Sequence, residues 1–123
     1  MTVVGQQLIN SVRAHAAQNP DFVYKSPDWT GSTCVYVYNG CASCLIGQAL
    51  FDLGLINPSM ETSQFNDFPI REIILDVLGL RFDAEELQWL SDVQTNQDLG
   101  NSWGDSVKLA DQAFLARMMD KSA

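Results

Sequence analysis

The segment Cys34–Leu55, CVYVYNGCASCLIGQALFDLGL, decides the fold because it joins a strand, a tight turn and a helix in one short stretch. Its β-branched and aromatic start, Cys34–Tyr38, favours a strand, and the Asn-Gly pair that follows ends the strand because both residues tolerate positive φ. Ser43 can cap a helix, and apolar residues after it recur at helical spacing. The sequence therefore predicts a helix over 43–54.

The remaining elements follow from local signals on either side of this segment. Apolar residues at helical spacing predict a first helix over 3–18. Residues 22–25 are expected to form a short strand that pairs antiparallel with the strand from Cys34. Three further helices are expected from their start signals, which are Pro69, the capping box Asp83–Glu86 and the similar Ser102–Asp105.

Length and composition define the fold class. With 123 residues and 46% hydrophobic content, the chain is expected to form one domain over 1–123. Because a two-stranded ribbon is marginal by itself, it must lie on helices. The predicted class is α+β, mostly helical, with about five helices and one short antiparallel two-stranded ribbon. The residues expected in its core are Tyr36, Leu45, Leu50, Leu53, Ile74, Leu78, Leu87, Leu90, Val107 and Phe114.

Targeting signals and the number of cysteines indicate in which cellular compartment the protein is expected to act. The first residues show neither a basic region nor a long apolar core, so we expect no secretory signal. No apolar run approaches the length of a membrane span, so no membrane association is expected. Three cysteines are an odd number, which together with the missing signal predicts reduced thiols in the cytoplasm.

Charge is unevenly distributed along the chain. The net charge is −8, and residues 82–107 contain no lysine or arginine but six acidic residues. Such a stretch argues against direct binding to nucleic acid, which requires cations, and permits a protein partner with a basic surface. The alternative is a solvated helix face. The candidate partner-binding residues are Glu85, Glu86, Asp92 and Asp98, with Trp103 in a turn that is expected to be exposed.

The Cys-x-x-Cys motif, Cys41 to Cys44, is the candidate thiol site. Unpaired N–H groups at a helix start favour a thiolate, and the stretch VYVYNGCASC locally resembles the redox motif of glutaredoxins and thioredoxins. That resemblance implies further strands and a proline-bearing strand facing the cysteines, whereas residues 56–123 predict helices. A thiol-disulfide oxidoreductase therefore remains an alternative, and the other interpretation is two small residues at a helix start.

A small zinc-binding module is the second alternative. Cys34, Cys41, Cys44 and His15 could in principle supply four ligands, but a structural site usually brings two close pairs and the sequence has one. His15 continues an apolar stripe of the first helix, which is typical of a core or boundary histidine. We therefore expect no metal and no cofactor.

Catalytic signatures are absent from the sequence, and two amides stand out instead. The chain has no Gly-x-Ser-x-Gly, Walker A or Rossmann glycine pattern, so no catalytic residue is assigned and a non-enzymatic protein is favoured. Gln94 and Gln97 continue the buried side of the fourth helix, close to Trp103. Buried amides need partners, so they either hold the next turn or bind a ligand.

A resemblance spans residues 34–110. It is carried by Cys34-x-Tyr36, Gly40, Ser43-Cys44-Leu45-Ile46-Gly47, Leu50 and Gln94-x-x-Gln97-Asp98-x-Gly100-x-x-Trp103-Gly104-x-x-Val107. In these residues the chain resembles small uncharacterised proteins of actinobacteria and their phages. The resemblance transfers no activity, but it implies a phage or prophage accessory protein that acts in the cytoplasm of a bacterial host. It also implies that Cys44, more than Cys41, belongs to the pattern.

Overall fold

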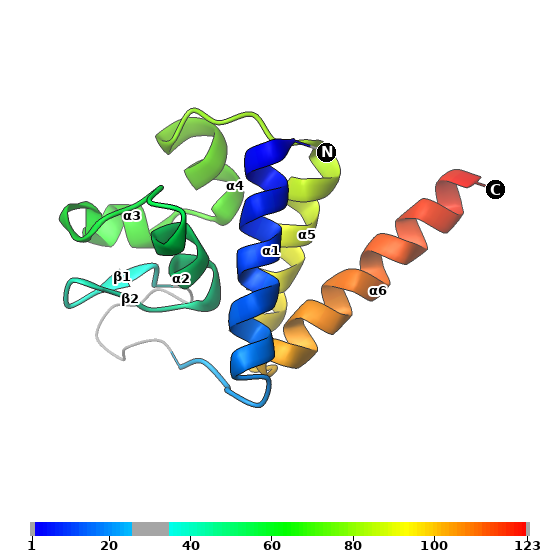
Figure 1. The fold of residues 1–123 in the computed structure, drawn as a ribbon, viewed down its shortest axis with the longest axis horizontal. Helices are drawn as coiled ribbons and strands as arrows, with labels where there is room; N and C mark the ends of the chain where they lie inside the picture. Colours follow the sequence, from blue (N-terminus) through cyan, green and yellow to red (C-terminus); the bar gives the residue numbers. More distant parts are fainter. Residues whose placement is uncertain (1, 26–34, 123) are drawn as a thin grey trace.

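The computed structural model describes residues 2–25 and 35–122 (Figure 1). Helix α1, Val3–Gln18, has the predicted bounds and runs along the middle of the molecule. Thr2 caps it, because its hydroxyl accepts a hydrogen bond from the Gly5 N–H at 3.1 Å. The buried side chains of α1 recur at helical spacing, so the helix presents one apolar face to the core.

The ribbon is a local hairpin, which corrects the predicted pairing. Strand β1, Val37–Tyr38, pairs antiparallel with β2, Cys41–Ala42. The two turn residues between them have φ of 53° and 74°, the geometry that favours Asn-Gly in a two-residue hairpin. Such a turn closes a very short loop, at less entropic cost than pairing with residues 22–25. In that segment only Val23 pairs, through an isolated bridge to Ser102.

Helix α2, Leu45–Asp52, starts two residues later than predicted because Cys44, not Ser43, is its N-cap. The Cys44 Sγ accepts from the Gly47 N–H at 3.4 Å. Gly47 is needed there, because a Cβ at this position would lie 2.5 Å from the carbonyl oxygen of Tyr36. The missing side chain lets α2 lie directly against the segment that leads into β1.

Short helical pieces occupy the segment between α2 and the long helices. They are η1 (Pro58–Met60), α3 (Ser63–Asp67) and α4 (Ile70–Glu72), which continues into the π-helix η2 (Ile73–Val77). The predicted start near Pro69 is therefore confirmed, and the π-helix closes with the Leu78 N–H bonded to the Ile73 carbonyl at 2.9 Å. Glu61 stabilises the hairpin turn, because its carboxylate accepts from the N–H groups of Asn39 and Gly40, both at 2.9 Å.

Two long helices complete the fold. Helix α5, Ala84–Asp98, begins with the predicted capping box, and α6, Trp103–Ser122, begins where Ser102 Oγ accepts from the Asp105 N–H at 3.2 Å. Helix α6 packs on α5 but runs away from α1 toward the C-terminus (Figure 1). The described chain thus consists of helices and one two-stranded antiparallel ribbon, which confirms the mostly helical α+β class.

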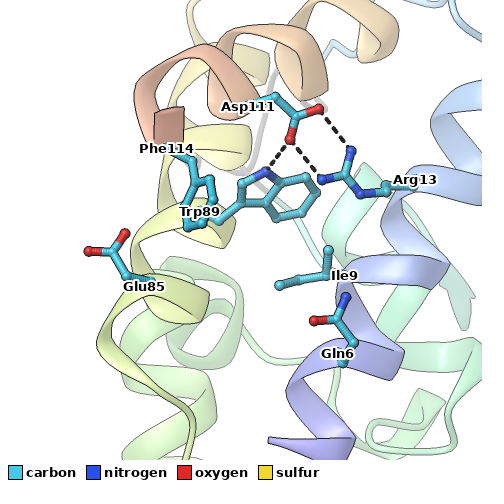
Figure 2. A pocket seen from close by; sticks show the side chains of 7 residues that line it. All are labelled: Gln6, Ile9, Arg13, Glu85, Trp89, Asp111 and Phe114. Carbon is cyan, nitrogen blue, oxygen red and sulfur yellow. Dashed lines mark hydrogen bonds and ion pairs between the residues drawn. The ribbon is translucent and has the colours of Figure 1, made fainter. Parts of the chain in front are cut away.

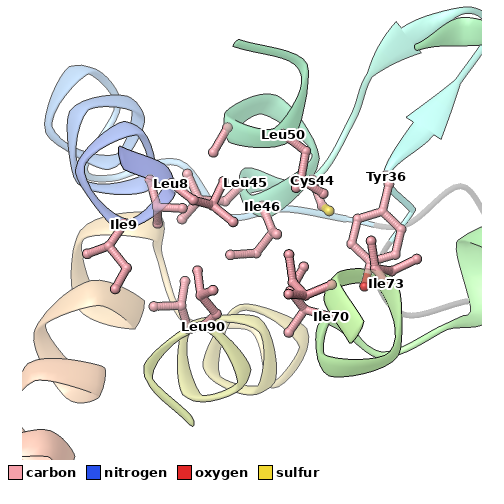
Figure 3. Close-up of a cluster of buried hydrophobic side chains, with 14 of the residues drawn as sticks. Leu8, Ile9, Tyr36, Cys44, Leu45, Ile46, Leu50, Ile70, Ile73 and Leu90 are labelled. Atoms are coloured by element: carbon pink, nitrogen blue, oxygen red, sulfur yellow. The ribbon is translucent and has the colours of Figure 1, made fainter. Parts of the chain in front are cut away.

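The core lies between α1, α2, α4 and α5 (Figure 3). Six of the residues expected there are buried, which are Tyr36, Leu45, Leu50, Ile74, Leu87 and Leu90. Four others, Leu53, Leu78, Val107 and Phe114, are partly buried against it. Cys34, for which a strand position and a possible metal-ligand role were expected, lies outside the described residues. Within the described ranges, no helix combines the length and the apolarity that a membrane crossing would require.

Candidate functional site

Helix α5 carries the four carboxylates of the expected partner surface, but Glu86 is an interior residue. Its side chain is 0% exposed, and its carboxylate accepts hydrogen bonds from Thr2 N at 3.1 Å, Thr2 Oγ at 2.8 Å and Asp83 N at 2.8 Å. Glu86 therefore closes the capping box of α5 and fastens the start of α1 to it. Its predicted place on an exposed acidic surface is wrong.

Glu85 and Asp92 share one cation from another helix. Arg117 of α6 donates from Nε to Glu85 at 2.9 Å and from Nη1 to Asp92 at 3.1 Å. The sequence window 82–107 contains no cation, yet the packing of α6 on α5 brings one to it. Arg117 offsets part of the charge of these two carboxylates, so this part of the surface is less acidic than its sequence indicates.

Trp103 is buried, which contradicts its predicted exposure. It is 2% exposed, its indole N–H donates to Gln97 Oε1 at 3.2 Å, and the ring of Phe22 packs edge-on at a centroid distance of 4.6 Å. The same Gln97 oxygen accepts from the Leu45 N–H at 2.9 Å. Asp98, which is half-buried, accepts from Gln97 Nε2 at 3.3 Å. This end of α5 therefore fastens the starts of α6 and α2.

Gln94 has an equivalent role one turn earlier. Its Oε1 accepts from the Ile70 N–H at 3.0 Å, and its Nε2 donates to the Tyr36 hydroxyl at 2.6 Å. That hydroxyl in turn donates to the carbonyl of Phe68 at 2.7 Å. The amides of Gln94 and Gln97 thus satisfy buried groups of neighbouring elements, which is the structural alternative given for them.

The two cysteines of the motif differ in accessibility. Cys41 is exposed on β2, whereas Cys44 is 0% exposed and packs with the core while it caps α2 (Figure 3). Cys41 is the thiol that a protein substrate could reach, whereas Cys44 is accessible only from within the chain. The arrangement gives Cys44 a part in the folded structure as the N-cap of α2.

His15 belongs to a contact between α1 and α2. Its Nε2 contacts Asp52 Oδ2, and the same oxygen accepts from Ser11 Oγ at 3.0 Å. In a catalytic triad the serine bonds to the histidine, whereas here both bond to the carboxylate. Among the residues that the structure describes, no group of three His, Cys, Asp or Glu side chains is placed to hold a metal.

A groove opens where α6 diverges from α1 (Figure 2). The space inside it is about 60 Å³, well below the several hundred Å³ of a typical small-ligand pocket. Helix α5 forms its floor, and α1 and α6 form its walls. This α1–α6 groove is lined by Gln6, Ile9, Arg13, Glu85, Trp89, Asp111 and Phe114.

One end of the groove is closed by an ion pair. Arg13 donates to Asp111 through Nη1 at 2.8 Å and Nη2 at 2.7 Å, and the Trp89 indole N–H donates to Asp111 at 2.9 Å. The Arg13 guanidinium also lies 4.8 Å from the centre of the Trp89 ring. The hydrogen bonds from Arg13, and secondarily the one from Trp89, hold the pKa of Asp111 below its ordinary value.

The lowered pKa of Asp111 predicts a pH dependence of stability. Its contribution is complete above the unfolded pKa of about 3.9 and is lost as the pH falls through the lower folded value. Both side chains are about 40% exposed (44% and 40%), so we expect Asp111→Asn to cost only about 0.5–1 kcal/mol near pH 7. Urea unfolding measured from pH 7 to about pH 2.5 should show this difference shrinking toward zero. An undiminished difference at the lowest pH would contradict the assignment.

The groove residues were largely missed from the sequence. Trp89 continues the buried spacing of Glu86, Leu90 and Val93, which is the one local signal for its position. The pairing of Arg13 with Asp111 joins residues that are 98 positions apart, and no sequence pattern indicates it. Of the predicted partner-binding residues, Glu85 alone lines the groove.

Comparisons of the chain with protein-family models, curated protein sequences and solved structures find no match, so the residues themselves must carry the functional argument.

Proposed function

We propose that this protein acts without catalysis, by binding another protein that presents a basic surface, and that the α1–α6 groove is the centre of the contact. The observation that carries the proposal is the groove itself, an open concavity with an apolar floor and a carboxylate at its mouth (Figure 2). Interfaces concentrate their binding energy where an anchor side chain of one partner fills such a pocket of the other.

The apolar part of the groove suits an anchor of this kind. Ile9 and Trp89 are buried at its base, and Phe114 is partly buried beside them. Phe114 is therefore the lining residue whose apolar surface an anchor could remove from water, at about 25 cal/mol per Å², because Ile9 and Trp89 are already only 4% and 3% exposed. On the outer side of α6, Leu115 and Met119 are 59% and 71% exposed, and they enlarge the apolar surface available to a partner.

Charge favours a basic partner over an acidic or neutral one. The chain has a net charge of −8, and at the groove Glu85 bonds to Arg117, which also bonds to Asp92. Complementary charge chiefly accelerates encounter, so binding should weaken with salt and mostly through the association rate. The resemblance to proteins of actinobacteria and their phages supports a partner in the cytoplasm of a bacterial host.

We expect Glu85→Lys to reduce partner capture and its salt dependence, and Phe114→Ala to reduce capture about tenfold through loss of apolar contact. The measurement is quantitative co-purification from the bacterial host at about 0.05 and 0.3 M salt, where screening differs strongly. Glu72→Lys is the matched control, because it makes the same charge change at an exposed position of α4 away from the groove.

Thermal melts establish that each variant is folded before its capture is compared. If the folded Glu85→Lys and Phe114→Ala proteins retain the same partners at the same salt dependence as the Glu72→Lys control, the groove is not the binding site and the proposal fails.

A further inference from the structure

We propose that Asn39 is a site of spontaneous covalent modification, at which the side-chain amide is converted to a carboxylate, and that Glu61 sets the rate of this conversion. The site is the hairpin turn between β1 and β2, on the side of the molecule away from α6, and it is independent of the proposed function (Figure 1). Three features support it: the residue order in the turn, the backbone conformation there and the contact with Glu61.

The residue pair in the turn has the chemistry that the conversion needs. Of the seven asparagines in the chain, Asn39 alone precedes a glycine. In such a pair the backbone nitrogen of the glycine loses its proton and attacks Cγ of the asparagine, since no side chain on the glycine shields that nitrogen. Ammonia leaves, a cyclic imide forms, and water opens the imide at either carbonyl. The products are aspartate and isoaspartate, so water is consumed and ammonia is released.

The folded turn exposes this pair but holds it in an unreactive conformation. Asn39 and Gly40 are both exposed. Asn39 has a φ of 53°, and in a hairpin turn of this type its ψ is about 30°. Such a ψ places the Gly40 nitrogen on the opposite side of the Cα–C bond from Cβ, so the nitrogen cannot reach Cγ. The attack therefore requires the turn to open and the ψ of Asn39 to rotate.

Glu61 holds the turn in this unreactive conformation. Its carboxylate oxygens accept from the N–H groups of Asn39 and Gly40, both at 2.9 Å, so rotation of the peptide between these residues breaks at least one of the two bonds. The carboxylate also opposes the chemistry itself, because a negative charge beside the Gly40 nitrogen disfavours loss of its proton. Both effects slow the conversion for as long as Glu61 is bonded to the turn.

A second asparagine near the ribbon has the opposite environment and serves as an internal reference. Asn66 is only 8% exposed, its Oδ1 accepts from the N–H groups of Tyr36 at 3.0 Å and Val37 at 3.1 Å, and its Nδ2 donates to the Val37 carbonyl at 3.0 Å. The residue that follows it is Asp67, whose side chain shields the backbone nitrogen. Asn66 is therefore expected to stay unmodified in the folded protein.

Conversion of Asn39 would change the ribbon. Isoaspartate adds a carbon to the backbone path, so the two-residue turn could no longer keep the register of β1 and β2. Aspartate keeps the backbone but places a second carboxylate beside Glu61, which weakens the contact by repulsion. Because Asn66 bonds to β1 on its other side, the loss of pairing falls on β2, which leads into the Cys44 N-cap of α2.

The test follows Asn39 by peptide mapping and mass spectrometry while the purified protein is incubated at mildly alkaline pH. The wild type is compared with Glu61→Ala, which removes both acceptors, and with Glu61→Gln, which keeps one acceptor oxygen and the size of the side chain. Glu72→Ala is the matched control, because it removes an exposed carboxylate of α4. Thermal melts establish that each variant is folded, and the wild type unfolded in urea gives the rate of an open turn.

We expect Asn39 to convert about tenfold faster in Glu61→Ala than in the wild type, because hydrogen bonds to a charged group change an equilibrium by about this factor. The rate in Glu61→Gln should lie between these two, and Glu72→Ala should convert at the wild-type rate. The chain in urea should convert fastest. Amide hydrogen exchange at Asn39 and Gly40 should also accelerate in Glu61→Ala, since the same opening exposes both N–H groups.

Each other result would overturn a named part of the proposal. Equal rates in Glu61→Ala and the wild type would remove the role of Glu61, and so would a slower rate, which would mean that the carboxylate takes the Gly40 proton. Conversion of Asn66 together with Asn39 in Glu61→Ala would trace the faster rate to general unfolding. An Asn39 that stays unmodified in urea would rule out the site, and a folded wild type that converts as fast as the chain in urea would rule out protection by the turn.

Discussion

Replacing Glu86 by alanine should lower the free energy of unfolding by about 2–4 kcal/mol, because hydrogen bonds to a charged group contribute about 1.5–3 kcal/mol each and do not add fully. The carboxylate accepts from Thr2 N, Thr2 Oγ and Asp83 N, and no other carboxylate of α5 is as deeply buried. Its loss would leave three donors unsatisfied and release the start of α1 from α5. Urea unfolding at neutral pH measures the change.

Two variants make the Glu86 experiment specific. Glu72→Ala removes an exposed carboxylate of α4 and should change stability by less than about 0.5 kcal/mol. Glu86→Gln keeps the shape and one acceptor oxygen, so its loss should lie between those of Glu72→Ala and Glu86→Ala. A loss below about 1 kcal/mol for Glu86→Ala would show that the side chain does not hold α1 and α5 together in solution.

Signals confined to a few residues predicted the structure well. The bounds of α1, the helix start near Pro69 and the capping box of α5 each depend on neighbouring residues, and each is confirmed. The residues expected in the core also lie inside or against it, because helical spacing fixes which side of a helix is apolar. In this chain, capping and spacing were sufficient to predict the mostly helical class.

Pairings between distant segments account for the errors. The strand from Cys34 was assigned the wrong partner because the Asn-Gly turn closes a hairpin on itself. The acidic window 82–107 appeared uncompensated because Arg117 lies beyond it in sequence and opposite it in space. Trp103 follows Gly100 and was expected in an exposed turn, yet Phe22 and Gln97 enclose it. The order of charged and apolar residues along the chain does not reveal which helices pack together.

The candidate groove was unpredictable for the same reason. Its ion pair joins Arg13 of α1 to Asp111 of α6. These two helices form the groove walls, lie far apart in the sequence, and both pack on α5. The sequence did predict Glu85 as a partner-binding residue, on the ground of charge, and the structure adds the apolar base beside it. An acidic residue becomes a specific recognition feature only when packing supplies an adjoining apolar concavity, and that adjacency arises from tertiary structure.

Replacing Leu50 by alanine should cost about 2–5 kcal/mol, the range for a buried leucine whose removal leaves a cavity. Leu50 is 0% exposed on α2 and lies within the central apolar cluster, so little room exists for neighbours to collapse into the space (Figure 3). Denaturant unfolding measures the loss, with circular dichroism as the probe.

Leu115 provides the matched control for Leu50, because it is a helical leucine that is 59% exposed. Leu115→Ala removes the same atoms from a surface position and should change stability by less than about 0.5 kcal/mol. If Leu50→Ala costs less than about 1 kcal/mol, the face of α2 assigned to the core is wrong. Because α2 lies against both α1 and the segment before β1, such an error would also displace the Gly47 contact with Tyr36 on which the register of α2 depends.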